Sequence, residues 1–208
     1  MPFGTHPTPE DGVRAAVRLV REGGADAIKL EGGKEVAPVV AALVNNGIPV
    51  IGHVGLLPTR AAQTGFRVQG RTAEGALRVL RDARAVAEAG AFAFVIEAIP
   101  HRVARIATAE LNRRGVFTIG IGAGPDCNGQ VLVCADALGE WRGHQAKFVR
   151  RFAEVGDAAE EGSRAYVAAV KDGSFPDAKK EGYEMEMGEW QRLRNMLAEN
   201  EPDIVVPD

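Results

Sequence analysis

Short apolar runs alternate with helix-like segments from residue 8 to residue 133, and this alternation constrains the fold more than any other feature. The apolar runs are 25–30, 48–54, 91–96, 116–121 and 130–133, and the helix-like segments are 8–22, 36–44, 72–90 and 100–115. Runs this short fit buried strands, and strands that alternate with helices form a parallel sheet with crossover helices. The sequence therefore predicts an α/β fold with five parallel strands.

The remaining third of the chain is predicted to be mainly helical. Helices are expected at about 145–155, 158–172 and 184–199, and the composition becomes more charged after residue 176. We therefore expect an α/β domain over 1–176 and a C-terminal helical extension with a flexible end over 177–208. At the other end, Thr8 is placed to cap the first helix and Pro9 suits its first turn.

The composition argues against several classes of protein. The chain has 208 residues, of which 46% are hydrophobic and 25% are charged, enough for one substantial core. The formal net charge of -3 provides no basic field for nucleic acid, and no apolar run reaches the roughly 18 residues of a membrane span. Cys127 and Cys134 lack a metal-type arrangement with nearby histidines, so a reduced thiol pair is expected. We expect neither nucleic acid nor membrane as a partner.

Lys29 and Glu31 flank Leu30 at the end of the first apolar run. Because side chains alternate along a strand, both should point to the same face of the sheet. At the carboxyl end of a parallel sheet, such a pair could hold an anionic substrate and a cation. A structural ion pair explains the same pattern equally well, and the spacing alone does not separate the two interpretations.

His53 lies near the end of the second apolar run, 48–54, and Glu97 directly follows the third, 91–96. A single histidine more often has a structural role, but the position of His53 at a strand end favours a function. Glu97 follows the apolar run 92–96, where partial loss of water would suit a general base. The alternative for Glu97 is a glutamate that caps the next helix or pairs with an arginine.

The glycines at 120, 122 and 124 suggest a dinucleotide-binding turn, but the pattern fails. Its third glycine should stand where the chain has Pro125, and no acidic partner for a ribose follows at the usual distance. The glycines instead favour a close approach of the backbone to a ligand.

Seven stretches of the sequence, in unbroken order, resemble the ketopantoate hydroxymethyltransferase (3-methyl-2-oxobutanoate hydroxymethyltransferase) family. Each stretch alone is weakly specific, but their order and spacing over about residues 2–176 are highly specific. The stretches are 28–33 (IKLEGG), 49–56 (PVIGHVGL), 66–71 (FRVQGR), 95–100 (VIEAIP), 119–133, 147–151 (KFVRR) and 173–176 (GSFP).

The resemblance implies a (β/α)8 barrel enzyme of pantothenate biosynthesis. Such an enzyme transfers a hydroxymethyl group from 5,10-methylenetetrahydrofolate to 3-methyl-2-oxobutanoate, gives 2-dehydropantoate, uses magnesium and forms homo-oligomers. By its place in the matching motifs, Glu97 corresponds to the proton acceptor, Lys29 to the lysine that contacts the oxo acid, and Glu31 to a magnesium ligand. We expect His53 to be a substrate-binding residue, whereas no residue is indicated for the folate.

The resemblance also implies an incomplete barrel. The family has two further metal and substrate positions, which would precede Met1, so we expect residues 1–176 to hold strands four to eight with their helices and to lack the first three strands. Glu31 would then be the one remaining magnesium carboxylate of the family, and magnesium binding is expected to be weak. A smaller departure is Ala135, where the family commonly has histidine.

Two functions stay open from the sequence. The first is the hydroxymethyltransferase activity of the family. The second is a catalytically impaired fragment or isoform of that enzyme, which acts only through subunit association. The order of the motifs disfavours a different lyase of the phosphoenolpyruvate mutase group. The sequence does not indicate a compartment, and we expect the cytoplasm for a bacterial protein and the mitochondrion for a eukaryotic one.

Overall fold

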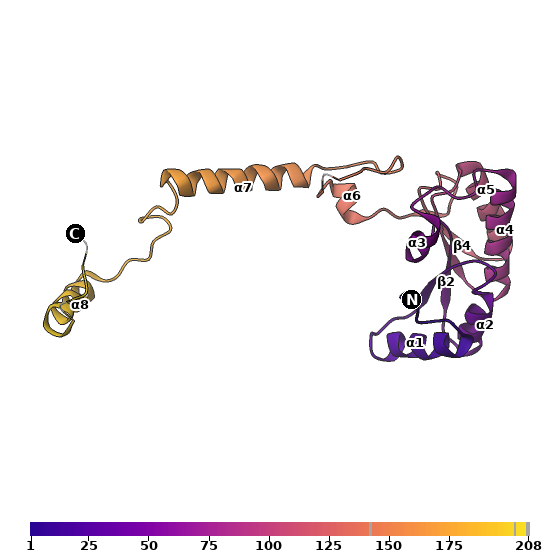
Figure 1. Ribbon diagram of the computed structural model, residues 1–208, viewed down its shortest axis with the longest axis horizontal. Coiled ribbons are helices and arrows are strands. Elements are labelled where there is room, and N and C mark those ends of the chain that lie inside the picture. Colours follow the sequence, from indigo (N-terminus) through magenta and orange to yellow (C-terminus); the bar gives the residue numbers. More distant parts are fainter. Residues whose placement is uncertain (142, 202, 207–208) are drawn as a thin grey trace. The chain divides into compact units, whose positions relative to one another are not determined.

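The alternation of strands and helices is present in the computed structural model, which describes residues 1–141, 143–201 and 203–206 (Figure 1). Within these residues, five parallel strands form one sheet in chain order: β1 (Ile28–Glu31), β2 (Val50–Gly55), β3 (Ala93–Glu97), β4 (Phe117–Ile121) and β5 (Gly129–Gln130). The helices before and between them are α1 (Pro9–Arg21), α2 (Ala37–Asn45), η1 (Pro58–Arg60), α3 (Ala61–Thr64), α4 (Ala73–Glu88) and α5 (His101–Asn112). The prediction of an α/β fold with a parallel sheet is confirmed.

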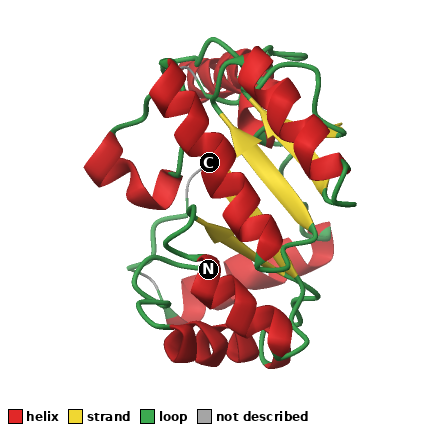
Figure 2. Cartoon of the chain, turned by 90° about the vertical axis from the view of Figure 1, so that its right-hand side faces the viewer, coloured by secondary structure: helices red, strands yellow, loops and turns green. Residues whose placement is uncertain are grey.

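Helices α2, α4 and α5 lie against one face of the sheet (Figures 1 and 2). Gly52 of β2 faces α4, because a Cβ at this position would lie 2.6 Å from the Phe94 ring and 2.9 Å from Val86 of α4. The strand residues on this face are buried, namely Ile28, Leu30, Val50, Val54, Phe94 and Ile96. Since successive side chains alternate, the residues between them project from the opposite face.

The beginning of α1 confirms the cap that the sequence suggests. The Thr8 hydroxyl oxygen accepts a hydrogen bond from the backbone N–H of Asp11, and Pro9 is the first residue of α1. At α4, the hydroxyl oxygen of Thr72 accepts from the N–H of Gly75 in the same way. Each cap satisfies one of the backbone donors that the first turn of a helix leaves unpaired.

The predicted helix at 145–155 is wrong, because residues 145–154 form a turn, a bend and irregular segments. The N–H of Val149 donates to the carbonyl of Ala146 in a turn, and the N–H of Phe152 donates to the carbonyl of Ala137 in α6 (Cys134–Leu138). The backbone of this segment therefore pairs locally and with α6 instead of forming its own helix. The sequence did not predict α6, and the strand expected at 130–133 is limited to β5.

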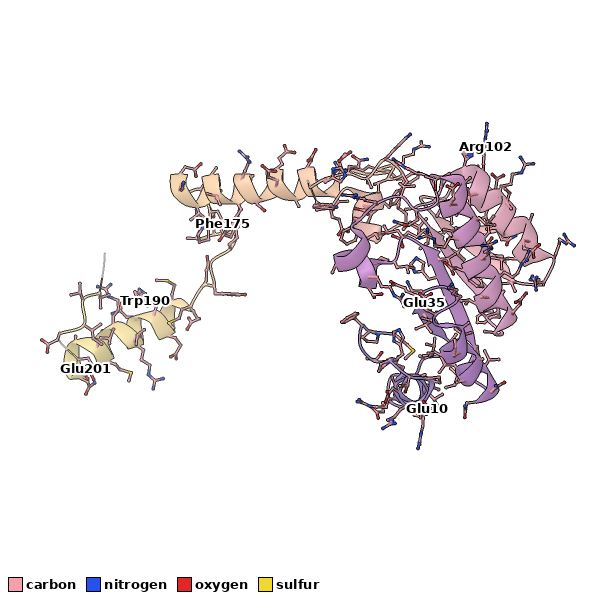
Figure 3. All side chains as sticks on the ribbon, turned by 45° about the vertical axis from the view of Figure 1, so that its right-hand side comes forward. Glu10, Glu35, Arg102, Phe175, Trp190 and Glu201 are labelled. Carbon is pink, nitrogen blue, oxygen red and sulfur yellow. The ribbon has the colours of Figure 1, made fainter. Side chains whose placement is uncertain are left out.

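The described chain divides into two compact units, Met1–Ala153 and Glu154–Asp208. The second unit contains α7 (Val155–Asp172) and α8 (Met187–Asn200), which match two predicted helices (Figure 3). Phe175 belongs to this unit because its ring packs edge-on against Tyr166 of α7, with 5.6 Å between ring centroids, and its N–H donates to Ala169. The division between the two units, after Ala153, thus lies earlier in the chain than the boundary expected after residue 176.

None of the helices in the described parts of the chain is long and apolar enough to cross a membrane.

Burial in the sheet distinguishes two neighbouring phenylalanines. Phe94 of β3 is fully buried, whereas Phe92, just before β3, is 49% exposed. Replacing Phe94 by Ala should lower the free energy of unfolding by about 3–5 kcal/mol, because the change leaves a cavity between the sheet and α4. The matched Phe92→Ala variant should lose about 1 kcal/mol or less. Urea unfolding of both variants checks this difference, and equal losses would contradict it.

Candidate active site

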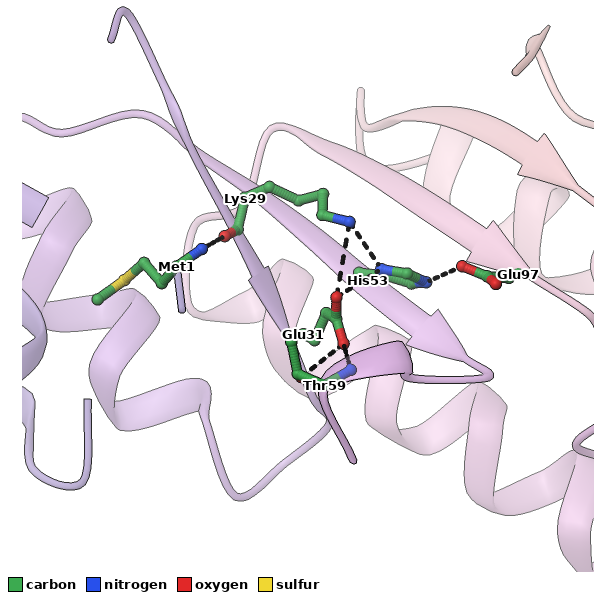
Figure 4. A network of polar contacts seen from close by, with 6 residues as sticks. All are labelled: Met1, Lys29, Glu31, His53, Thr59 and Glu97. Atoms are coloured by element: carbon green, nitrogen blue, oxygen red, sulfur yellow. Dashed lines mark hydrogen bonds and ion pairs between the residues drawn. The ribbon is translucent and has the colours of Figure 1, made fainter. Parts of the chain in front are cut away.

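All four predicted site residues meet on the face of the sheet opposite the helices (Figure 4). Lys29 and Glu31 come from β1, His53 from β2 and Glu97 from β3. In the parallel register Glu31 lies beside His53, and Glu97 lies beside Gly55, two residues further along β2. The alternation predicted for Lys29 and Glu31 is confirmed, since Leu30 between them is buried against the helices.

Lys29, Glu31 and His53 form a close polar cluster. The Nζ atom of Lys29 lies 3.2 Å from Nδ1 of His53, in hydrogen-bonding geometry, and 3.7 Å from Oε1 of Glu31. The same oxygen of Glu31 lies 3.8 Å from Nδ1 of His53. The Lys29 side chain is 45% exposed, so one end of the cluster opens to solvent.

Thr59 fixes the carboxylate of Glu31. Its hydroxyl and its backbone N–H both donate to Oε2 of Glu31, at 2.6 Å and 2.9 Å. Thr59 lies in η1, and an ion pair between Arg60 of η1 and Glu35 anchors this turn to the loop that follows β1. Oε1 of Glu31 is left to face Lys29 and His53.

The pKa of Glu31 lies below the ordinary value of a glutamate. Burial by itself would raise this pKa, but the hydrogen bonds from the Thr59 hydroxyl and N–H outweigh it, together with the charge of His53 when its ring is protonated and the charge of Lys29. Glu31 is therefore held as a carboxylate, the form that binds a cation.

His53 and Glu97 approach each other without forming a hydrogen bond. Nε2 of His53 lies 3.1 Å from Oε2 of Glu97, and the two side chains are 1% and 14% exposed. Nε2 is nevertheless the buried side-chain nitrogen that has no hydrogen-bond partner among the described residues. The atoms are close, but their relative direction is unfavourable.

The backbone around Glu97 is tightly fixed. Gly55 has a φ of 99°, and a Cβ at this position would collide with the carbonyl oxygen of Glu97, which accepts a hydrogen bond from the N–H of Leu56. Ala98 has a φ of 47°, a conformation rare for residues other than glycine, and its N–H donates to Ile121 of β4. Backbone strain of this kind is often found at functional sites.

A cavity of about 1530 Å³ opens beside Glu97. Its wall combines aromatic rings with cationic side chains, notably Phe66, Trp141, Phe148, Arg67, Arg71, Lys147 and Arg150. Gly122 and Gly124 also line it, but a Cβ at these positions would meet Phe148 and His101. These two glycines therefore permit close packing of the cavity wall, and the close approach of the backbone to a ligand stays a prediction.

Glu31 is the residue of this site best suited to a metal ion. In the part of the chain that the structure describes, no three histidine, cysteine, aspartate or glutamate side chains come together to hold a metal. Magnesium, however, is commonly bound by one or two carboxylates, with water and substrate oxygens at the other positions. Glu31 fits such a site as one ligand, because it is held as a carboxylate with Oε1 free of Thr59.

A lysine, two carboxylates and a histidine thus gather toward the carboxyl ends of the parallel strands of an α/β protein, the edge at which α/β enzymes carry their chemistry. Residues 1–178 match the family described as ketopantoate hydroxymethyltransferase, and the chain belongs to that family.

Curated relatives named 3-methyl-2-oxobutanoate hydroxymethyltransferase agree with this membership. The chain is similar to that of Heliobacterium modesticaldum, with 49% identity over 85% of this chain and 63% of the relative. For the relative from Anaeromyxobacter sp. the identity is 50% over 85% of this chain and 58% of the relative, and for that from Deinococcus radiodurans it is 51% over 85% and 62%. The chain thus spans about three fifths of the length of these relatives.

The structure adds Thr59 to the residues that the sequence indicated. Thr59 lies outside the strands and follows no alternating pattern. Its contact with Glu31 depends on the path of the loop after β2. The sequence signal that exists is the dipeptide Pro58-Thr59, which marks a turn close behind the run that ends at Gly55.

Replacing Thr59 by Val should raise the pKa of Glu31, because the variant lacks the hydroxyl that donates to Oε2. A carboxyl group whose pKa is lower in the folded than in the unfolded protein stabilises the fold when the pH is above its unfolded-state pKa. This stabilisation is lost as the pH falls through the folded-state pKa. The stability difference between wild type and variant should therefore shrink in acid. Carboxyl ¹³C NMR titration measures the pKa. Thr72→Val, which removes a distant helix cap, should leave it unchanged, and an unshifted Glu31 in Thr59→Val would disprove the contact.

Proposed function

We propose that this chain carries the proton-abstraction site of a 3-methyl-2-oxobutanoate hydroxymethyltransferase. The observation that carries the proposal is the position of Lys29 and Glu97 on one face of the sheet, on either side of His53 and beside a large cavity. In this arrangement Lys29 would serve as a cation for the carboxylate of an oxo acid and Glu97 as a general base within its reach. The names of the relatives support the same reaction.

The proposed roles follow from the chemistry of the groups. The Lys29 ammonium, which has donors and no acceptor, pairs with the substrate carboxylate. Glu97 accepts the proton from C3 of 3-methyl-2-oxobutanoate, and the electron pair of the broken C–H bond forms an enolate. C3 then attacks the methylene carbon of 5,10-methylenetetrahydrofolate to form a carbon–carbon bond. Both carbon–nitrogen bonds of that carbon break, and water supplies the oxygen of the new hydroxyl group. The proton taken from C3 and one proton of the water go to the two nitrogens of tetrahydrofolate, which leaves.

Magnesium is proposed as the metal of this site, with Glu31 as its protein ligand. When bound, magnesium would act as a Lewis acid that stabilises negative charge on the oxo acid. Glu31 is also 3.7 Å from the Lys29 ammonium, so the described residues alone should bind the cation weakly. Thr59 would keep the carboxylate in place whether or not the cation is present.

The cavity beside Glu97 is proposed as the site of the folate co-substrate. Phe66 and Trp141 would contact its flat rings, and Arg67, Arg71 and Lys147 would bind its carboxylates. The cavity touches Glu97, so the one-carbon unit would lie next to the carbon that loses its proton.

We also propose that the sheet is part of a (β/α)8 barrel. Parallel strands in chain order, with helices on one face and polar strand-end residues on the other, agree with the wall of such a barrel. Assembly into a homo-oligomer and the role of residues 177–208 as a C-terminal extension rest on the family resemblance alone. The Lys29–Glu97 geometry favours the enzyme over the alternative of a chain that acts only through subunit association.

Exchange of the C3 proton tests the role of Glu97. In D₂O the protein should exchange the C3 proton of 3-methyl-2-oxobutanoate for deuterium, followed by ¹H NMR of its methyl groups. Glu97→Gln should reduce the rate by about 10²–10⁴-fold, because the base is lost. Glu74→Gln, on the exposed first turn of α4, serves as the control and should retain the wild-type rate. Equal exchange by wild type and Glu97→Gln would refute the proposed function.

Binding of Mn²⁺, a paramagnetic substitute for magnesium, tests the role of Glu31. Electron paramagnetic resonance should show weak Mn²⁺ binding that strengthens when 3-methyl-2-oxobutanoate is added, because the oxo acid supplies further oxygen ligands. Glu31→Gln should abolish the substrate-dependent part, whereas Glu74→Gln, on the exposed first turn of α4, should retain it. Unchanged Mn²⁺ binding by Glu31→Gln would show that the metal, if bound, lies elsewhere.

A further inference from the structure

His53 is the most deeply buried polar residue of the site, and its two ring nitrogens have different surroundings. Its side chain is 1% exposed, with Nδ1 hydrogen-bonded to Lys29 Nζ and Nε2 facing Glu97. Glu31 is the third charged neighbour, 3.8 Å from Nδ1. Because so little of its surface is exposed, the ring is poorly placed to bind a substrate directly. Its role is better sought in its contacts with the neighbouring side chains.

The contact with Lys29 determines where the ring carries its proton. A lysine ammonium donates hydrogen bonds and accepts none, so Nδ1 must be the acceptor in the 3.2 Å contact. A proton on Nδ1 would point two donors at each other. The Glu31 oxygen, at 3.8 Å, is too distant to hold such a proton by a hydrogen bond. The ring proton therefore belongs on Nε2.

A proton on Nε2 gives Glu97 a hydrogen-bond donor at short range. Oε2 of Glu97 lies 3.1 Å away, yet Nε2 lacks a hydrogen bond to any described residue. A buried donor without a partner is costly and rare. Catalytic hydrogen bonds are often poorly aligned before substrate binds and tighten in the substrate complex. A small rotation of the Glu97 carboxylate would complete this one.

We propose that His53 is a positioning residue that aims the Glu97 carboxylate, with its own proton held on Nε2 by Lys29. Nε2–H holds one oxygen of Glu97, which leaves the other oxygen to accept the C3 proton. Because Lys29 is also the proposed contact for the substrate carboxylate, His53 couples substrate binding to the alignment of the base. This role rests on the proposed function of Glu97, but the position of the ring proton does not.

The position of the proton can be measured without any activity. The chain has four histidines, and replacing His6, His101 and His144 by Gln leaves His53 as the single one. In protein labelled with ¹⁵N-histidine, long-range ¹H–¹⁵N spectra at neutral pH should show a neutral ring protonated on Nε2. Lys29→Met in the same background should mix the two tautomers. A ring protonated on Nδ1, or on both nitrogens, would overturn the proposal.

Two substitutions of His53 separate positioning from substrate binding in the C3 exchange assay. Glutamine can place an amide N–H near the position of Nε2, whereas asparagine reaches only the position of Nδ1. His53→Asn should lower kcat by about 10–100-fold, the effect of one hydrogen bond to a charged group. His53→Gln should recover most of this loss, and KM for the oxo acid should change by less than about threefold in both.

A rise in KM with unchanged kcat would show that His53 binds substrate, and equal kcat values for His53→Asn and wild type would also overturn the proposal. Thermal melting confirms that both variants are folded, and the tautomer measurement decides the question if they are not. Absence of exchange in the wild type would count against the proposed function of Glu97 and would leave the tautomer result as the separate test of His53.

Discussion

The parallel register of β1, β2 and β3 determines where every group of the site lies. It sets Glu31 beside His53 and brings Glu97 beside Gly55. Because Gly55 has no side chain, β2 can pass close to the carbonyl of Glu97 in β3. The Glu97 carboxylate is directed toward His53. A shift of one residue in any of these strands would turn its polar residues into the hydrophobic core.

The core on the other face of the sheet maintains this register. Phe94 fills the space left by Gly52, and Val86 of α4 packs over Gly52. Leu30 and Val54 are buried on the same side, so a displaced strand would expose apolar surface and bury charge. The precision of the polar site thus depends on hydrophobic packing behind it, and Thr59 adds a local constraint on Glu31.

Local sequence patterns were sufficient to predict the sheet and to place Lys29 and Glu31 on a shared face, because strand alternation is a short-range property. The contact of Thr59 with Glu31 depends on how a loop folds back over β1, which periodicity does not encode. The helix expected at 145–155 was wrong for a related reason, since the N–H of Phe152 pairs with Ala137 in α6. The hydrogen bond between Lys29 and His53 likewise joins strands whose pairing the sequence only implied. The roles assigned to Glu97, Lys29, Glu31 and His53 remain predictions.

The central claim is that Lys29 and Glu97 act on the same bound oxo acid. A crystal structure of the protein with 3-methyl-2-oxobutanoate tests this claim most directly. The substrate carboxylate should lie within hydrogen-bonding distance of Lys29 Nζ, with C3 facing the Glu97 carboxylate. An oxo acid bound away from these two side chains, or with C3 turned from Glu97, would contradict it.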